Sequence, residues 1–175
     1  MIFELAMDRH NNLGLALAGA NRLEEATAEW RKAVALDPAF TQGYFNLGKA
    51  AELRGNWAEA NRHYRAGVRA GPNWVAQVRR AAWLLATCPD AAVRNGAEAS
   101  ALAERAVRLS GGEDAESLDA LAAAQAELGR FADAVRTGRR ALTLARAEKR
   151  DALSRDLTAR IALYESGKPF RLGRP

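Results

Sequence analysis

The sequence predicts an all-α protein, an α-solenoid of about four helical pairs followed by a C-terminal capping helix. Three observations predict it: small and aromatic residues recur with a period of 34 residues, each period carries two stretches of helical spacing, and a proline closes each of the first two periods. A period of this length is typical of α-solenoids, in which each repeat packs only on its neighbours. We therefore expect one continuous array over residues 1–167 and a basic tail over 168–175.

The first two repeats, residues 7–40 and 41–74, carry the pattern most clearly. Small residues at matching positions let two helices approach closely, large side chains fill the space between them, and proline stops the second helix. A shift of 34 residues makes these positions coincide: Leu13-Gly14 with Leu47-Gly48, Leu23 with Trp57, Ala26 with Ala60, Trp30 with Tyr64, and Pro38 with Pro72. Each repeat is therefore predicted to form two amphipathic helices.

This pattern resembles the tetratricopeptide repeat (TPR) signature, in which Leu-Gly, Ala-x-x-x-aromatic and proline follow one another at fixed spacing. In the second repeat the signature appears as Leu47-Gly48, Ala60-x-x-x-Tyr64 and Pro72. The resemblance implies a right-handed superhelix whose first helices line a concave groove, in which protein partners bind in extended form. It also implies that positions 2, 5, 6, 9, 12 and 13 of each repeat face this groove.

The later repeats are less regular. Residues 75–114 are expected to form a degenerate third repeat, whose turn over 87–95 is about five residues longer than the matching turns of the other repeats. Residues 115–148 resume the pattern. A helix over about 149–167 is expected to cover the apolar face that the last repeat would otherwise expose.

Three Asn-x-x-Glu pairs predict where the second helices of the first three repeats begin. An asparagine side chain can accept from the first free N–H groups of a helix, and a glutamate is favourable in the first turn. The pairs are Asn21 with Glu24, Asn56 with Glu59, and Asn95 with Glu98, and the first two caps could shift by a residue.

Composition places the chain among globular proteins. Of its 175 residues, 49% are hydrophobic and 27% are charged, and a single cysteine excludes an internal disulfide. The first residues lack the basic and long apolar regions of a signal peptide, and no window is apolar enough for a membrane span. These features favour the cytoplasm, although the chain could be a fragment of a larger protein.

No residue set points to catalysis, a metal or a cofactor, so we expect a protein that is not an enzyme. The run from Gly43 to Lys49 has the frame of a phosphate-binding loop, but Ala50 lacks the hydroxyl that such a loop needs and the run lies inside a predicted helix. Cys88 has no neighbouring histidine in the sequence, and the two histidines stand on different repeats.

The net charge of +5 lies mostly at the C-terminal end of the chain. Residues 146–175 carry eight Lys or Arg against four Asp or Glu, which leaves +4 there. A solvated basic tail accounts for this excess, and nucleic acid is not the expected partner.

Residues at the groove positions of the first three repeats predict a peptide-binding site. Asparagine amides both donate and accept, so they can hold a peptide backbone whatever its side chains. Lysine and arginine can hold a carboxylate, and an exposed tryptophan can anchor apolar groups. The expected partner is a protein or peptide, with an acidic segment favoured by the cations. The candidate residues are Asn12, Phe45, Asn46, Lys49, Arg79, Arg80 and Trp83.

This set resembles part of the carboxylate clamp of chaperone-binding TPR domains and of the asparagine ladder of TPR-bearing glycosyltransferases. It departs from the clamp at Asn11 and Ala76, where the clamp has lysines, and this departure puts the binding of chaperone tails in doubt. The runs at 85–90 and 163–170 resemble the C-terminal TPR arrays of bacterial membrane and envelope proteins.

Three alternatives stay open at this point. Asn46 and Lys49 could be solvated residues without a partner, and Trp83 could pack against the long turn over 87–95. The chain could also be the regulatory or substrate-presenting segment of a larger enzyme, such as an envelope glycosyltransferase.

Overall fold

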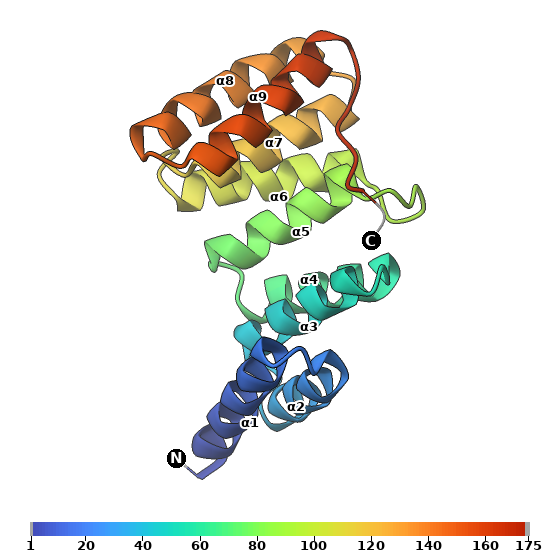
Figure 1. Cartoon of the computed structure of the whole chain (residues 1–175), viewed down its shortest axis with the longest axis vertical. Coiled ribbons are helices and arrows are strands. Elements are labelled where there is room, and N and C mark those ends of the chain that lie inside the picture. Colours follow the sequence, from blue (N-terminus) through green and yellow to red (C-terminus); the bar gives the residue numbers. More distant parts are fainter. Residues whose placement is uncertain (1, 174–175) are drawn as a thin grey trace. The chain divides into compact units, whose positions relative to one another are not determined.

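The computed structural model describes residues 2–173, with side chains from residue 5 onward. Over this range the chain forms nine α-helices and no strand (Figure 1). The predicted all-α solenoid of helical pairs is confirmed. The last two residues of the predicted tail, 174 and 175, lie outside the described range. The chain divides into two compact units, unit 1 up to Gln77 and unit 2 from Val78 onward, and each is described by itself.

Unit 1 consists of two helical pairs. They are α1 (Ile2–Gly19) with α2 (Leu23–Leu36), and α3 (Thr41–Leu53) with α4 (Trp57–Ala70). A buried cluster that includes Leu17, Trp30 and Leu47 joins α1, α2 and α3. The first three helices of the unit therefore share one hydrophobic core.

Within each pair of unit 1, a glycine lies opposite a buried aromatic ring. A Cβ atom at Gly14 would lie 2.5 Å from Nε1 of Trp30, and one at Gly48 would lie 2.4 Å from Cε1 of Tyr64. Both aromatic side chains are buried. Only glycine allows so close an approach, which explains why Leu-Gly and the aromatic residue recur together in the repeat.

Unit 2 is formed by five helices, the first of which begins just before the unit boundary. They are α5 (Val75–Thr87), α6 (Gly96–Leu109), α7 (Ala115–Glu127), α8 (Phe131–Ala147) and α9 (Asp151–Glu165). Its core is rich in alanine, with Ala82, Ala103 and Ala120 packed together. α9 inserts Leu157 and Tyr164 into two buried clusters shared with α7 and α8.

Two of the three predicted helix caps are confirmed, and the third is shifted by one residue and lacks the side-chain hydrogen bond. The side chains of Asn56 and Asn95 accept from the backbone N–H three residues later, at 3.3 and 3.0 Å. α2 instead begins after Arg22, which makes no side-chain cap. Asn21 adopts a left-handed φ of 61° and ends the preceding turn, a role that asparagine tolerates better than most residues. The boundaries of the four predicted repeats stay predictions.

Candidate peptide-binding faces

We name two faces by the predicted groove positions that their helices carry. The α1–α3 face of unit 1 comprises Asp8, Asn11, Asn12, Leu15, Ala18, Gly19, Gln42, Phe45, Asn46, Lys49, Glu52 and Leu53. The α5–α7 face of unit 2 comprises Arg79, Arg80, Trp83, Ala86, Thr87, Glu116, Asp119, Ala120, Ala123, Ala126 and Glu127.

An asparagine pair links the two helices of the α1–α3 face. The amide of Asn46 donates to Oδ1 of Asn11 at 3.1 Å, and Gln42 donates to Oδ1 of Asn46 at 3.3 Å. Asn11 and Asn46 are both buried, whereas Asn12 is exposed. Asn46, which was predicted to bind a peptide backbone, is thus hydrogen-bonded within the chain to Asn11 and Gln42.

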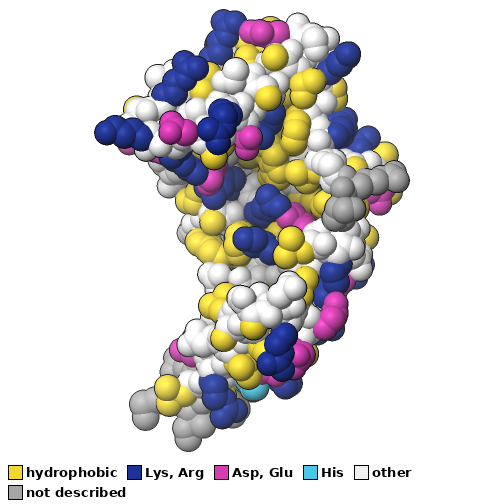
Figure 2. All heavy atoms as spheres, viewed as in Figure 1, with side chains coloured by type: hydrophobic (Ala, Val, Ile, Leu, Met, Phe, Trp, Pro, Cys, Tyr) yellow, Lys and Arg dark blue, Asp and Glu magenta, His cyan; other side chains and the backbone are white. Residues whose placement is uncertain are grey.

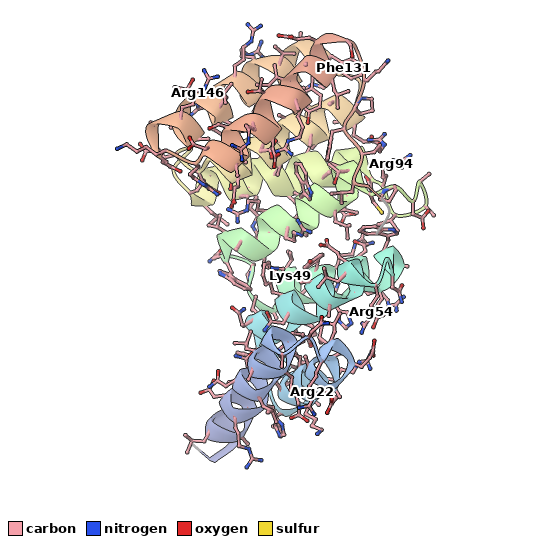
Figure 3. The ribbon with its side chains drawn as sticks, viewed as in Figure 1. Arg22, Lys49, Arg54, Arg94, Phe131 and Arg146 are labelled. Atoms are coloured by element: carbon pink, nitrogen blue, oxygen red, sulfur yellow. The ribbon has the colours of Figure 1, made fainter. Side chains whose placement is uncertain are left out.

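Phe45 and Lys49 stand one turn apart on α3. The Phe45 ring packs against Trp74 with 5.1 Å between ring centroids and against Tyr64 with 6.1 Å, so it is half-buried. Lys49 Nζ lies 5.8 Å from the centroid of Phe45, and the side chain is exposed (Figure 3). Lys49 makes no ion pair with any described residue, so its charge is available to an anionic group.

Two large apolar side chains are exposed on the same face. Leu15 of α1 is 47% exposed and Leu53 of α3 is 67% exposed. Neither was among the candidate residues, although both stand at groove positions. The face thus combines exposed apolar surface with an exposed lysine and an exposed asparagine.

On the α5–α7 face, Arg79 is already paired. Its guanidinium lies 2.9 Å from Asp114 and 2.5 Å from Glu116. Burial alone would raise the pKa of Asp114, but hydrogen bonds from Ser117 and Arg79 lower it overall. Arg80 is half-buried and also interacts with other groups. The expected field of free cations on this face is therefore weakened at Arg79 by two carboxylates.

A buried ion pair lies deeper in the α5–α7 face. Arg160 of α9 donates to both carboxylate oxygens of Asp119, at 3.1 and 2.8 Å, and both residues are buried. Burial raises the pKa of Asp119 to about 6, although the charge and hydrogen bonds of Arg160 act in the opposite direction. The ion pair with Asp119 fixes the position of the Arg160 guanidinium.

The C-terminal tail, residues 168–173, lies on the α5–α7 face. It leaves α9 and runs without helical structure toward the C-terminal end of α5 (Figure 1), where hydrophobic side chains gather between α5 and the end of α9 (Figure 2). Phe170 packs against Trp83 with ring centroids 5.7 Å apart. The Arg160 guanidinium lies 5.1 and 5.4 Å from the two ring centroids. Trp83 thus contacts the tail of its own chain.

Polar contacts of the tail reach the same face. The backbone N–H of Leu172 donates to the carbonyl of Thr87 at 2.8 Å. The Arg171 side chain donates to the carbonyl of Ala86 at 3.3 Å and forms an ion pair with Glu127. An extended segment therefore already occupies groove positions of the third and fourth predicted repeats.

The seven candidate residues fall into two groups. Asn12, Phe45, Asn46 and Lys49 stand together on the α1–α3 face, and Arg79, Arg80 and Trp83 stand on the α5–α7 face. Their joint role as one binding site stays a prediction. The tail contacts were not predicted from the sequence. Two features could have indicated them: an aromatic residue followed by arginine in the tail, and a glutamate at a groove position.

The remaining titratable and reactive residues form no recognisable centre. His10 Nδ1 lies 2.6 Å from a Glu29 oxygen, and burial lowers the pKa of His63. Cys88 is a free, buried thiol. No group of three or more potential ligands arranged for a metal ion occurs within the described residues, and none of the described helices is long and apolar enough to cross a membrane.

Comparison with known proteins shows which type of repeat part of the chain resembles. Residues 14–55 match the family model described as TPR repeat. A 58-residue segment is 40% identical to the peroxisomal targeting signal receptor of Candida albicans, and it covers 33% of this chain and 10% of the receptor. The chain thus spans only a small part of that relative.

Two solved structures show the same fold at low identity. MamA (residue 41 to the end) from Desulfovibrio magneticus RS-1 is 12% identical, with 92% of this chain and 96% of that chain covered and a TM-score of 0.67. YrrB, described as a TPR protein with an unusual peptide-binding site, is 17% identical, with 95% and 93% covered and a TM-score of 0.63.

The repeat signature, the glycine-to-aromatic packing and the matched family model agree with one another. Residues 14–55 therefore match a tetratricopeptide repeat, and the described residues share the fold of these solved structures, of which YrrB is described as a TPR protein.

Proposed function

We propose that the chain is a non-catalytic interaction module that binds an extended segment of a partner protein along the first helices of its repeats. The open docking surface is the α1–α3 face, with Asn12, Phe45 and Lys49 as its polar and aromatic contacts and Asn46 as the buried residue that links α1 to α3. The observation that carries this proposal is the exposure of Leu15 and Leu53 at groove positions of this face.

The chemistry of the α1–α3 face suits a segment that is apolar and acidic. Leu15 and Leu53 offer apolar surface that loses its contact with water when a partner covers it. Lys49 offers an unpaired ammonium group for a carboxylate. The exposed Asn12 can bond the backbone of the bound segment.

The test begins with the selection of peptides that bind to the protein. Random twelve-residue peptides displayed on phage are selected on the full chain, and the enriched peptides are synthesised and titrated by calorimetry. We expect enrichment of acidic and apolar residues, and a loss of affinity of about tenfold, or 1.4 kcal/mol, in the Lys49→Glu variant. Leu53→Ser is expected to weaken binding as well.

The matched control is Arg62→Glu, because Arg62 is an exposed residue of α4 in the same unit and is not a groove position. It makes the same change in net charge as Lys49→Glu. Equal losses of affinity in both variants would show that net charge rather than the α1–α3 face is responsible, and the proposal would fail.

A further inference from the structure

We infer that the α5–α7 face is a second binding surface, for an extended protein segment that presents an aromatic, an arginine and an aliphatic side chain in succession. The chain's own tail occupies this surface through Phe170, Arg171 and Leu172, and a partner segment of the same chemistry binds by displacing it. This rests on the proposed function, because it takes the first-helix faces as surfaces that bind extended segments.

The first support is the hydrogen bonding at the end of α5. The last four carbonyl groups of a helix have no partner within the helix. In α5, those of residues 84 and 85 accept backbone N–H groups from the following turn, at 3.0 and 2.9 Å. Those of residues 86 and 87 accept from the Arg171 side chain and the Leu172 backbone. Two buried acceptors are thus satisfied by a segment from outside the helical pair.

The second support is the charge at this point. The C-terminal end of a helix carries a partial negative charge that favours a cation. Arg94 of the long turn (Figure 3) donates to one oxygen of Glu127 at 3.0 Å, and Arg171 pairs with the other oxygen. A guanidinium fits because it can bond a carboxylate and a backbone carbonyl at the same time. An acidic segment would meet Glu127 and the helix end with repulsion.

The third support is an aromatic slot whose two sides, Trp83 and Arg160, come from residues outside the tail. Arg160 is held by both oxygens of the buried Asp119 and covers Trp83. Phe170 completes the arrangement by contacting both the indole and the guanidinium. Another aromatic side chain can enter the same slot with the same contacts.

Because the tail is covalently joined to α9, it competes with a partner segment for the α5–α7 face. A segment joined by a few residues to the helix beside its site has an effective concentration on the order of millimolar. If the tail leaves the face free for about one-tenth of the time, a partner segment binds about tenfold more weakly than it would to the free face. Weakening the tail contacts should therefore strengthen binding in trans.

The experiment uses the full chain and a synthetic peptide. A fluorescein-labelled peptide of the sequence Gly-Lys-Pro-Phe-Arg-Leu-Gly, which is the tail segment 167–173, is titrated by fluorescence anisotropy against wild type, Arg171→Ala, and the double variant Phe170→Ala with Arg171→Ala. We expect weak binding to wild type and binding about tenfold tighter to the variants. A peptide with alanine in place of its arginine should not bind.

The control for the tail is Lys168→Ala, because Lys168 is exposed and its side chain forms no hydrogen bond or ion pair with any described residue. It should bind the peptide as wild type does. Adding Glu127→Gln to the Arg171→Ala variant should abolish the gain. Helical circular dichroism is checked for each variant, and if the double variant loses helix the single variant decides.

Equal affinity for wild type and the released variants, or no binding to any of them, would show that the tail is only a structural cap for α5 and would overturn the inference. Dimers of the released variants on size exclusion would also overturn it, since the occupant would then be a second copy. Failure here leaves the α1–α3 face untouched, and the Lys49→Glu and Arg62→Glu comparison tests that face independently.

Discussion

Lys49 and Leu53 of the α1–α3 face are exposed, whereas Trp83 and Thr87, which stand at the matching positions one repeat later, are covered by the C-terminal tail. The repeat pattern assigns both pairs to the same kind of surface. The difference arises from a segment outside the repeats. The position of a residue within a repeat therefore indicates which way it faces, while elements beyond the array decide whether that face is open.

The cores of the two units differ in a related way. Unit 1 packs each helical pair around a glycine and an aromatic ring, as the Gly48 and Tyr64 contact shows. Unit 2 packs many alanines and depends on α9, through Leu157 and Tyr164, to close its core. Perturbing α9 should therefore harm unit 2 and spare unit 1.

The largest expected effect follows from truncating a buried side chain of α9. Leu157 is 1% exposed and packs against Leu118 and Ala141. Leu157→Ala should lower the free energy of unfolding of unit 2 by about 2 to 5 kcal/mol. Hydrogen exchange followed by mass spectrometry should show lost protection in α7 and α8 and unchanged protection in α1 and α2.

The control for this prediction is Leu109→Ala, since Leu109 of α6 is 38% exposed and should cost far less. Equal loss of protection in both units on Leu157→Ala would mean that the two units unfold together. The prediction that a change in α9 destabilises unit 2 alone would then be wrong.

A smaller effect should appear as opposite pH dependence in the two units. Burial raises the pKa of Asp119 from 3.8 to about 6, so folded unit 2 retains a proton that the unfolded chain loses over this range. The contribution of Asp119 to stability is therefore fully present below pH 3.8 and falls, by up to about 3 kcal/mol, as the pH rises through 6.

Unit 1 should change in the other direction. Burial lowers the pKa of His63 below 6.5, so protonation favours the unfolded chain and stability falls as the pH drops below that value. Hydrogen exchange corrected for intrinsic rates at pH 4.5, 5.5 and 6.5 measures both slopes. Asp119→Asn should remove the slope of unit 2 and leave that of unit 1, and a slope that persists would assign it to another group.

The third prediction concerns close helix packing. In Gly48→Ala, the new Cβ would lie 2.4 Å from the buried Tyr64 ring and must displace it, so we expect a loss of about 1 to 3 kcal/mol. In Gly138→Ala of unit 2, the nearest atom is Cγ1 of Ile161 at 3.0 Å, and the cost should be smaller. Thermal unfolding of both variants compares the two kinds of core.

Gly19→Ala serves as the reference, because a Cβ there would meet nothing within 4 Å. It should leave stability unchanged or raise it by up to about 1 kcal/mol through the better helix propensity of alanine. A destabilisation of Gly19→Ala equal to that of Gly48→Ala would remove the steric explanation.

The helical pairs could be predicted from the sequence, because the spacing of glycine and aromatic residues reflects how the two helices of a pair pack against each other. The sequence also placed Lys49 and Leu53 at groove positions, where they are exposed. It could not place the tail, since the bond from Arg171 to Ala86 joins residues 85 positions apart that no periodicity connects. For the same reason the partner of Trp83 was not identified.

The smallest expected effect distinguishes the cations of the two faces. Lys49 is exposed beside the Phe45 ring, whereas Arg160 is buried against Trp83 and bonded to Asp119. Lys49→Met keeps the aliphatic stem and removes the charge, so it should change the free energy of unfolding by no more than about 1 kcal/mol, the usual size of a solvent-exposed cation–π contact. Arg160→Met should cost more, because it leaves the buried Asp119 without its partner. Urea unfolding of the two variants measures the difference. If Lys49→Met lowers the free energy of unfolding as much as Arg160→Met does, Lys49 stabilises the fold and is not a residue available to a partner.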